Sequence, residues 1–111
     1  MENTNIYGFY SGGYLFDMAD RVGQAVAITE LDYPYIMTMW GKVRYLKQAC
    51  EVPNRISVRP IRSIFSSDTV KVLVKLWDKD TLLCEVLLRF KGKNKNYCEN
   101  MKKNIKKILT M

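Results

Sequence analysis

The sequence predicts an α+β fold in which an antiparallel sheet wraps around one long central helix, with a basic helix added at the C-terminus. Three observations support this prediction. One long segment with helical spacing of apolar residues, 14–30, comes before every strand candidate. Four segments of strand character follow Pro34, and turn signals separate them. Because a helix this apolar needs a sheet to cover it, both parts belong to one domain.

The first element is a helix predicted over residues 14–30, directly after the Gly12-Gly13 pair. Mostly apolar residues recur there at helical spacing, and these are Leu15, Met18, Val22, Ala25, Val26 and Thr29. The small residues Ala19, Gly23 and Ala27 lie between them. This pattern predicts a helix that is covered on most sides. The helix is expected to end before Pro34.

The strands are predicted over residues 35–46, 55–65, 70–76 and 82–90. The third alternates cleanly between apolar and polar residues, and a turn at residues 78–80 joins it to the fourth in a hairpin. The second alternates imperfectly and contains Pro60, which predicts an edge position or a bulge.

Composition limits the possible chemistry. The chain has 111 residues, 48% of them apolar, which suits one domain with a packed core. No stretch approaches the roughly 18 continuous apolar residues of a membrane span, and the first residues do not resemble a signal peptide. We therefore expect a cytoplasmic protein.

Several classes of site are excluded by residue type. The three cysteines lack paired spacing, which argues against a disulfide framework and a zinc site. The chain has no histidine, so His-based triads and His-ligated metals are excluded. We expect no metal and no cofactor, and acid–base work falls to Asp and Glu.

The net charge of +7 is concentrated at the C-terminus. Residues 1–90 carry 11 basic and 10 acidic side chains, whereas residues 91–111 carry seven lysines and only Glu99. The chain therefore divides into a nearly neutral domain over residues 1–92 and a basic tail over residues 93–111. Proteins that bind duplex nucleic acid more often spread basic residues over a folded face, so no nucleic acid is expected.

The tail has the pattern of an amphipathic helix. Four apolar residues recur at helical spacing, Met101, Ile105, Ile108 and Leu109, with lysines between them. Docking of this helix on the domain's own sheet is the favoured interpretation. Contact with an anionic membrane surface and attraction of CoA or of an acidic acyl carrier protein are the alternatives.

Asn5, Gly8, Gly12, Gly13 and Asp20 form a spaced motif. It resembles the active-site signature of hot-dog fold acyl-CoA thioesterases of the phenylacetate-pathway and thioesterase superfamily type. That signature runs Asn-x-x-Gly-x-x-His-Gly-Gly, then six residues, then Asp. Five of its six marked positions match, and Ser11 stands where the family has His.

The resemblance continues into the strands, over about residues 5–90. Thr38 falls where the family often has Ser or Thr, and residues 43–49 look like the family's Ile-x-Tyr/Phe-x-x-Pro-Ala strand.

The resemblance implies hydrolysis of an acyl-thioester carried by CoA or by an acyl carrier protein. The Gly12 N–H would stabilise the oxyanion at the positive end of the helix, where Gly13 and Ser11 would also contact substrate. Asp20 would activate water or attack as a nucleophile. Asn5 would orient the water or the carbonyl, and Thr38 would hold the water.

The family builds its site across a dimer interface, with Asn and Gly from one subunit and Asp and Ser/Thr from the other. The resemblance therefore implies a homodimer or a dimer of dimers. It also implies a thin acyl pocket beside the helix, lined by Tyr14, Met18 or Trp40.

Arg55 and Arg59 share one face of their strand and are candidates for contact with CoA phosphates, with Arg62 on the other face. A solvated outer face is the favoured interpretation of these arginines.

Two alternatives stay open for the motif and its carboxylates. The alternative for Asp20 is a solvated side chain or an ion pair with Arg21 or Arg44, and Asp17 is explained by a favourable charge near the helix start or by pairing with Asp20. For the whole protein, the alternative to an enzyme is a non-catalytic hot-dog module that binds an acyl group or a partner.

Overall fold

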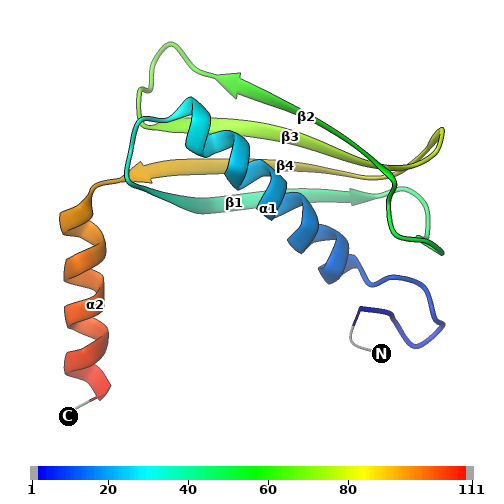
Figure 1. Cartoon of the computed structure of the whole chain (residues 1–111), viewed down its shortest axis with the longest axis horizontal. Helices are drawn as coiled ribbons and strands as arrows, with labels where there is room; N and C mark the ends of the chain where they lie inside the picture. Colours follow the sequence, from blue (N-terminus) through cyan, green and yellow to red (C-terminus); the bar gives the residue numbers. More distant parts are fainter. Residues whose placement is uncertain (1–2, 110–111) are drawn as a thin grey trace.

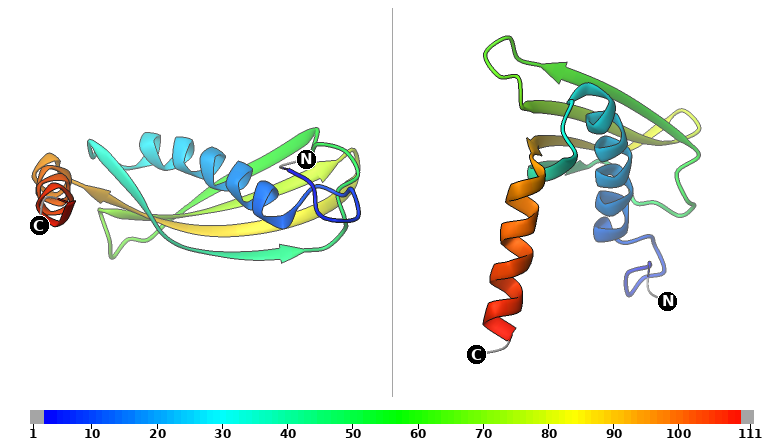
Figure 2. Two further views of the ribbon diagram at one scale, coloured as in Figure 1. Left: turned by 90° about the horizontal axis from the view of Figure 1, so that it is seen from below. Right: turned by 60° about the vertical axis from the view of Figure 1, so that its left-hand side comes forward.

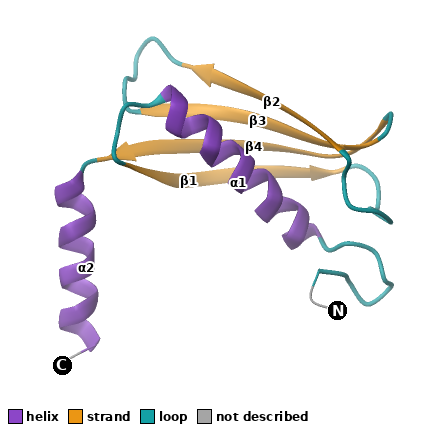
Figure 3. Ribbon diagram, in the orientation of Figure 1, coloured by secondary structure: helices purple, strands orange, loops and turns teal. Residues whose placement is uncertain are grey.

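The computed structural model describes residues 3–109, apart from the side chains at positions 95, 97, 98 and 101. Its elements in order are α1 (Gly12–Glu30), β1 (Tyr35–Tyr45), β2 (Arg55–Arg62), β3 (Thr69–Asp78), β4 (Thr81–Lys93) and α2 (Lys95–Leu109). The four strands form one sheet, which Figures 1 and 3 show crossed by α1, with α2 beyond one end. The predicted elements and their order are confirmed.

The sheet is antiparallel throughout, in the order β1-β4-β3-β2. The β3–β4 hairpin therefore forms its centre, and β2 lies at an edge. Pro60 pairs with Val72 across β2 and β3, and its missing N–H is accommodated because no strand among the described residues lies beyond β2. This confirms the edge position that Pro60 predicted.

The core lies between α1 and one face of the sheet. Alternate side chains of the central hairpin are fully buried on that face, and these are Val70, Val72, Val74 and Leu76 from β3 and Cys84, Val86, Leu88 and Phe90 from β4. Figure 2 (left) shows α1 on this side of the curved sheet. The period-two pattern of these strands thus selects the face that α1 covers.

Helix α1 is fully buried along one stripe and half-buried on both flanks of that stripe, and its exposed residues lie on the opposite side, so the prediction of a helix covered on most sides is confirmed. The buried residues are Leu15, Ala19, Gly23 and Ala27, whereas Ile28 is 58% exposed. A Cβ at Gly23 would lie 2.9 Å from Leu88 Cδ1. The small residues that separated the larger apolar ones in the sequence are therefore the ones that contact the sheet, because they allow close approach of the helix backbone.

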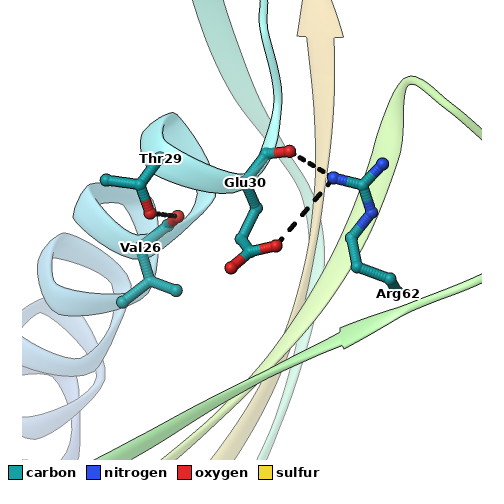
Figure 4. Close-up of polar contacts among 4 residues, drawn as sticks. All are labelled: Val26, Thr29, Glu30 and Arg62. Atoms are coloured by element: carbon teal, nitrogen blue, oxygen red, sulfur yellow. Dashed lines mark hydrogen bonds and ion pairs between the residues drawn. The ribbon is translucent and has the colours of Figure 1, made fainter.

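The C-terminal end of α1 is tied to the edge strand β2. The Arg62 guanidinium donates a hydrogen bond to the Glu30 carbonyl oxygen and lies 4.0 Å from the Glu30 carboxylate (Figure 4). Thr29 Oγ1 donates to the Val26 carbonyl oxygen at 2.7 Å in the same turn. A cation at a helix C-terminus interacts favourably with the last carbonyl groups, so Arg62 helps to hold α1 across the sheet.

Helix α2 does not dock on the sheet, which corrects the favoured interpretation of the tail. It projects beyond the end of the sheet (Figures 1 and 2), and every side chain from 102 to 109 is exposed. None of the helices within residues 3–109 combines the length and hydropathy required to cross a bilayer.

Candidate functional site

Asp20 and Thr38, 18 residues apart in the sequence, meet between α1 and β1. Thr38 Oγ1 donates a hydrogen bond of 2.8 Å to Asp20 Oδ1, and both residues are partly buried. Thr38 pairs with the buried Phe90 of β4, so its side chain points to the face that α1 covers. The two residues that the motif assigned to the reacting end of the site are therefore brought together.

A β-bulge directly after Thr38 shapes this region. The pairing of β1 with β4 shifts between Thr38 and Trp40, so that β1 contains one extra residue. The bulge turns Trp40 to the outer face, where Lys71 Nζ lies 5.9 Å from the ring centroid. Trp40 consequently lies on the face opposite α1, and its proposed place in an acyl pocket beside that helix is wrong within this chain.

Asp20 does not form either of the ion pairs considered for it. Arg21 instead pairs with Asp17 at 3.0 Å, one turn away along the exposed side of α1, and Arg44 lies 3.9 Å from Glu85. The two helix carboxylates thus have different environments: Asp17 is solvated and paired with a cation, whereas Asp20 accepts from a hydroxyl at the sheet.

The N-terminus of α1 presents unpaired amides. Ser11 is the N-cap, and its Oγ accepts a hydrogen bond of 3.2 Å from the Tyr14 N–H. Neither the Gly12 nor the Gly13 N–H has an acceptor among the described residues. These amides carry the positive end of the helix dipole and are suited to hold a developing negative charge.

The two glycines differ in what surrounds them. A Cβ at Gly12 would lie 2.7 Å from Tyr45 Cζ, whereas a Cβ at Gly13 would meet nothing within 4 Å. The Tyr45 hydroxyl donates a hydrogen bond of 2.8 Å to the Gly12 carbonyl oxygen. The Cα of Gly12 therefore makes room for a tyrosine of the same chain, whereas no described atom crowds the Cα of Gly13.

Tyr45 is the residue that sequence reasoning missed. It belongs to the strand segment that resembled the family, but the pattern assigned it no role. Partial burial, with a smaller effect of the Cys84 thiol, raises the pKa of Tyr45 above its ordinary value. The hydroxyl therefore stays protonated at neutral pH and can donate to Gly12.

Asn5 organises the loop before α1. Its Oδ1 accepts hydrogen bonds from the Tyr7 N–H at 2.9 Å and the Phe9 N–H at 3.2 Å. Gly8 has a φ of 85°, which a residue with a side chain rarely adopts, and its N–H donates to the Asn5 carbonyl oxygen at 3.0 Å. The Tyr10 N–H donates a hydrogen bond of 2.8 Å to the Ala49 carbonyl oxygen and so connects this loop to the segment after β1. Asn5 and Gly8, the first two residues of the motif, thus shape one loop. These hydrogen bonds of Asn5 lie within this loop and do not involve Asp20.

A surface hollow of about 380 Å³ lies beside α1, lined by Asn3, Tyr14, Asp17, Met18 and Arg21. It contains two of the three residues expected beside an acyl chain, Tyr14 and Met18.

Arg55 and Arg59 lie on the face of the sheet opposite α1, and Arg62 lies on the α1 face. Arg55 stacks on the Trp77 ring, 4.2 Å from its centroid. Strand alternation brings basic side chains from all four strands to this outer face: Lys42, Arg44, Arg55, Arg59, Lys71, Lys75, Arg89 and Lys91. The structure does not bring Arg55 or Arg59 together with Asp20 of the same chain.

Neither a family model nor a curated protein matches the chain, but solved structures do. One is smu.793 of Streptococcus mutans bound to acetyl CoA, 24% identical with a TM-score of 0.66 over 85% of this chain and 76% of that chain. This chain has the hot-dog fold. The hot-dog fold implied by the resemblance is thereby confirmed.

Two further hot-dog structures extend the comparison. The hexameric thioesterase y2039 of Yersinia pestis is 16% identical, with a TM-score of 0.74 over 86% of this chain and 83% of that chain. A putative thioesterase, a phenylacetic acid degradation-related protein of Ralstonia eutropha, is 22% identical, with a TM-score of 0.68 over 81% of this chain and 67% of that chain. The second belongs to the type that the motif resembled.

Proposed function

We propose that this hot-dog protein hydrolyses acyl-thioesters of the acyl-CoA class, with Asp20 as general base and Thr38 as its positioning partner. The observation that carries the proposal is the 2.8 Å hydrogen bond from Thr38 Oγ1 to Asp20 Oδ1 in a partly buried position. That bond occupies one carboxylate oxygen and leaves the other to accept a proton from water.

The reaction needs one water and no cofactor. Asp20 takes a proton from the water as its oxygen bonds to the thioester carbonyl carbon, and negative charge develops on the carbonyl oxygen. When the tetrahedral intermediate collapses, the carbon–sulfur bond breaks and the leaving thiolate takes the proton from Asp20. The products are a carboxylic acid and a free thiol.

The amides at the start of α1 are suited to the oxyanion. The N–H groups of Gly12 and Gly13 lack acceptors among the described residues, and the helix dipole favours negative charge there. One such donor is typically worth about 3–4 kcal/mol in the transition state.

Helix geometry favours a site shared by two subunits. Gly12 and Asp20 are eight residues apart in α1, which at about 1.5 Å per residue is roughly 12 Å along the axis. One thioester carbonyl cannot contact both within a chain, because each must approach it to about 3 Å. We therefore propose a homo-oligomer in which Gly12 and Asn5 of one subunit meet Asp20 and Thr38 of another.

CoA is the carrier that the comparisons favour. One of the similar structures holds acetyl CoA and another, from Streptococcus pneumoniae, holds coenzyme A. Arg55 and Arg59 face away from Asp20 in their own chain, so any contact with the phosphates of a CoA at Asp20 would come from a second subunit.

The test is thiol release from a panel of acyl-CoA and acyl-carrier thioesters. Asp20→Asn keeps the size of the side chain and its ability to accept from Thr38 but removes the base. We expect kcat/KM to fall at least about 100-fold. Sedimentation of the same preparations should give a dimer or a larger assembly.

Asp32→Asn is the matched control, because Asp32 is an exposed carboxylate just beyond α1 and should leave turnover unchanged. Absence of turnover by the wild-type protein over the whole panel would contradict hydrolysis and leave the acyl- or partner-binding module as the function. An active protein that is insensitive to Asp20→Asn would contradict the assigned base.

A further inference from the structure

Helix α2 is an amphipathic helix with an apolar side that no element of the described chain covers. Ile105 is 53% exposed, Ile108 is 69% exposed and Leu109 is 80% exposed. Figure 2 (right) shows α2 running clear of the sheet and separated from α1. Exposed aliphatic side chains gathered on one helix are the usual mark of a surface that binds something else.

The lysines of α2 lie beside this apolar side. At about 100° per residue, Ile105, Ile108 and Leu109 fall within an arc of about 100°. Lys102, Lys103, Lys106 and Lys107 occupy the neighbouring arc, and all four are exposed. An apolar stripe next to a lysine-rich face is the pattern of helices that lie in a lipid interface.

Charge selects among the possible occupants. Residues 95–109 contain five lysines and one glutamate, so a second α2 packed against the first would bring together two strongly positive segments. A surface of anionic lipids instead attracts every lysine and accepts the three aliphatic side chains below its headgroups. We propose that α2 binds the surface of anionic membranes and holds the hot-dog domain beside it.

The helix would lie on the membrane. It is 15 residues long and carries four lysines in its second half, so it has neither the length nor the hydropathy to span a bilayer. The proposal is independent of thioester hydrolysis, because neither Asp20 nor Thr38 belongs to α2.

Co-sedimentation of the full-length protein with vesicles tests the proposal. Vesicles of phosphatidylcholine with phosphatidylserine should bind the protein, and vesicles of phosphatidylcholine alone should not. Replacing Lys102, Lys103, Lys106 and Lys107 by Gln should weaken binding at least about 100-fold, since each lysine contributes about fivefold near an anionic surface. Thiol-release activity in solution should be unchanged by these substitutions.

A matched variant distinguishes vesicle binding by α2 from vesicle binding by the basic outer face of the sheet. Replacing Lys42, Lys71, Lys75 and Lys91 by Gln removes the same charge from the domain and should leave vesicle binding within about twofold. Stronger loss in this variant than in the α2 variant would overturn the assignment.

Two further results would overturn the proposal. One is an absence of binding to the phosphatidylserine vesicles, which would favour an acidic protein as the partner. The other is wild-type binding by a variant with Ile105, Ile108 and Leu109 replaced by Ser, because insertion of the apolar stripe would then contribute nothing.

Discussion

The two helices have similar apolar spacing in the sequence and opposite positions in the structure. Helix α1 buries small residues against the sheet, and α2 exposes every side chain from 102 to 109. The difference follows from residue size and charge. Ala19, Gly23 and Ala27 let α1 approach the sheet closely, whereas α2 has lysines beside its aliphatic residues. Helical spacing thus shows that a helix has an apolar side. The size of the residues on that side and the charge of the residues beside it determine what the apolar side contacts.

The same contrast applies to the faces of the sheet. Asp17, Asp20 and Glu30 lie on α1, on the same side of the sheet as Arg21 and Arg62. Eight basic side chains from four strands collect on the outer side with Glu85. The nearly neutral sum over residues 1–90 conceals this excess of basic residues on the outer face.

The largest effect is expected where α1 is closest to the sheet. Gly23→Val would place methyl groups against Leu88 and Phe90, which already lie 2.9 and 3.1 Å from an ideal Cβ. Overpacking of this kind costs about 2–3 kcal/mol in the free energy of unfolding. Denaturation by urea at one fixed protein concentration measures it.

Gly13→Ala is the control for this prediction. A Cβ at Gly13 meets no atom within 4 Å, so the alanine should leave the free energy of unfolding unchanged or raise it slightly. Equal destabilisation by the two variants would show that close approach to the sheet is not what Gly23 provides.

An intermediate effect is expected at the contact between α1 and β1. Thr38→Val keeps the shape of the side chain but removes the hydroxyl that donates to Asp20. We expect kcat/KM for thioester hydrolysis to fall about tenfold, in line with loss of a hydrogen bond to a charged group.

Thr38→Ser restores the hydroxyl and should recover most of the activity. A Thr38→Val enzyme with unchanged turnover would limit the hydroxyl to a packing role.

The smallest effect is expected on α2. Ile108→Gln should change the free energy of unfolding by less than about 0.5 kcal/mol, because the side chain is 69% exposed. Thermal or urea denaturation in the absence of lipid measures it. A loss as large as that of Gly23→Val would mean that α2 packs against the chain or its oligomer in solution, and the contrast between the two helices would fail.

Much of the fold could be predicted because local patterns specify it. The alternation over residues 70–76 is reproduced in β3, and Pro60 placed its strand at the edge through the missing backbone donor. The resemblance to known thioesterases also assigned Asp20 and Thr38 to one site, and the structure brings the two side chains together. The roles of Asn5, Ser11, Gly12 and Gly13 in catalysis stay predictions.

Other features could not be predicted because they depend on register or on packing. One extra residue after Thr38 moves Trp40 to the opposite face, and no local propensity announces a bulge there. Tyr45 approaches Gly12 only because β1 passes the start of α1. Docking of the tail failed as a prediction because helical spacing alone does not identify a partner surface.

By itself, the sequence of this protein determined which segments form helices and strands and in what order, since periodicity, turns and capping are local properties of the chain. Tertiary structure alone decided three outcomes. It decided which small residues of α1 pack against the sheet, that the Thr38 hydroxyl donates to Asp20, and that the basic residues of the strands share one face. Those outcomes depend on strand register and interlayer distance, which only the packing of distant segments sets.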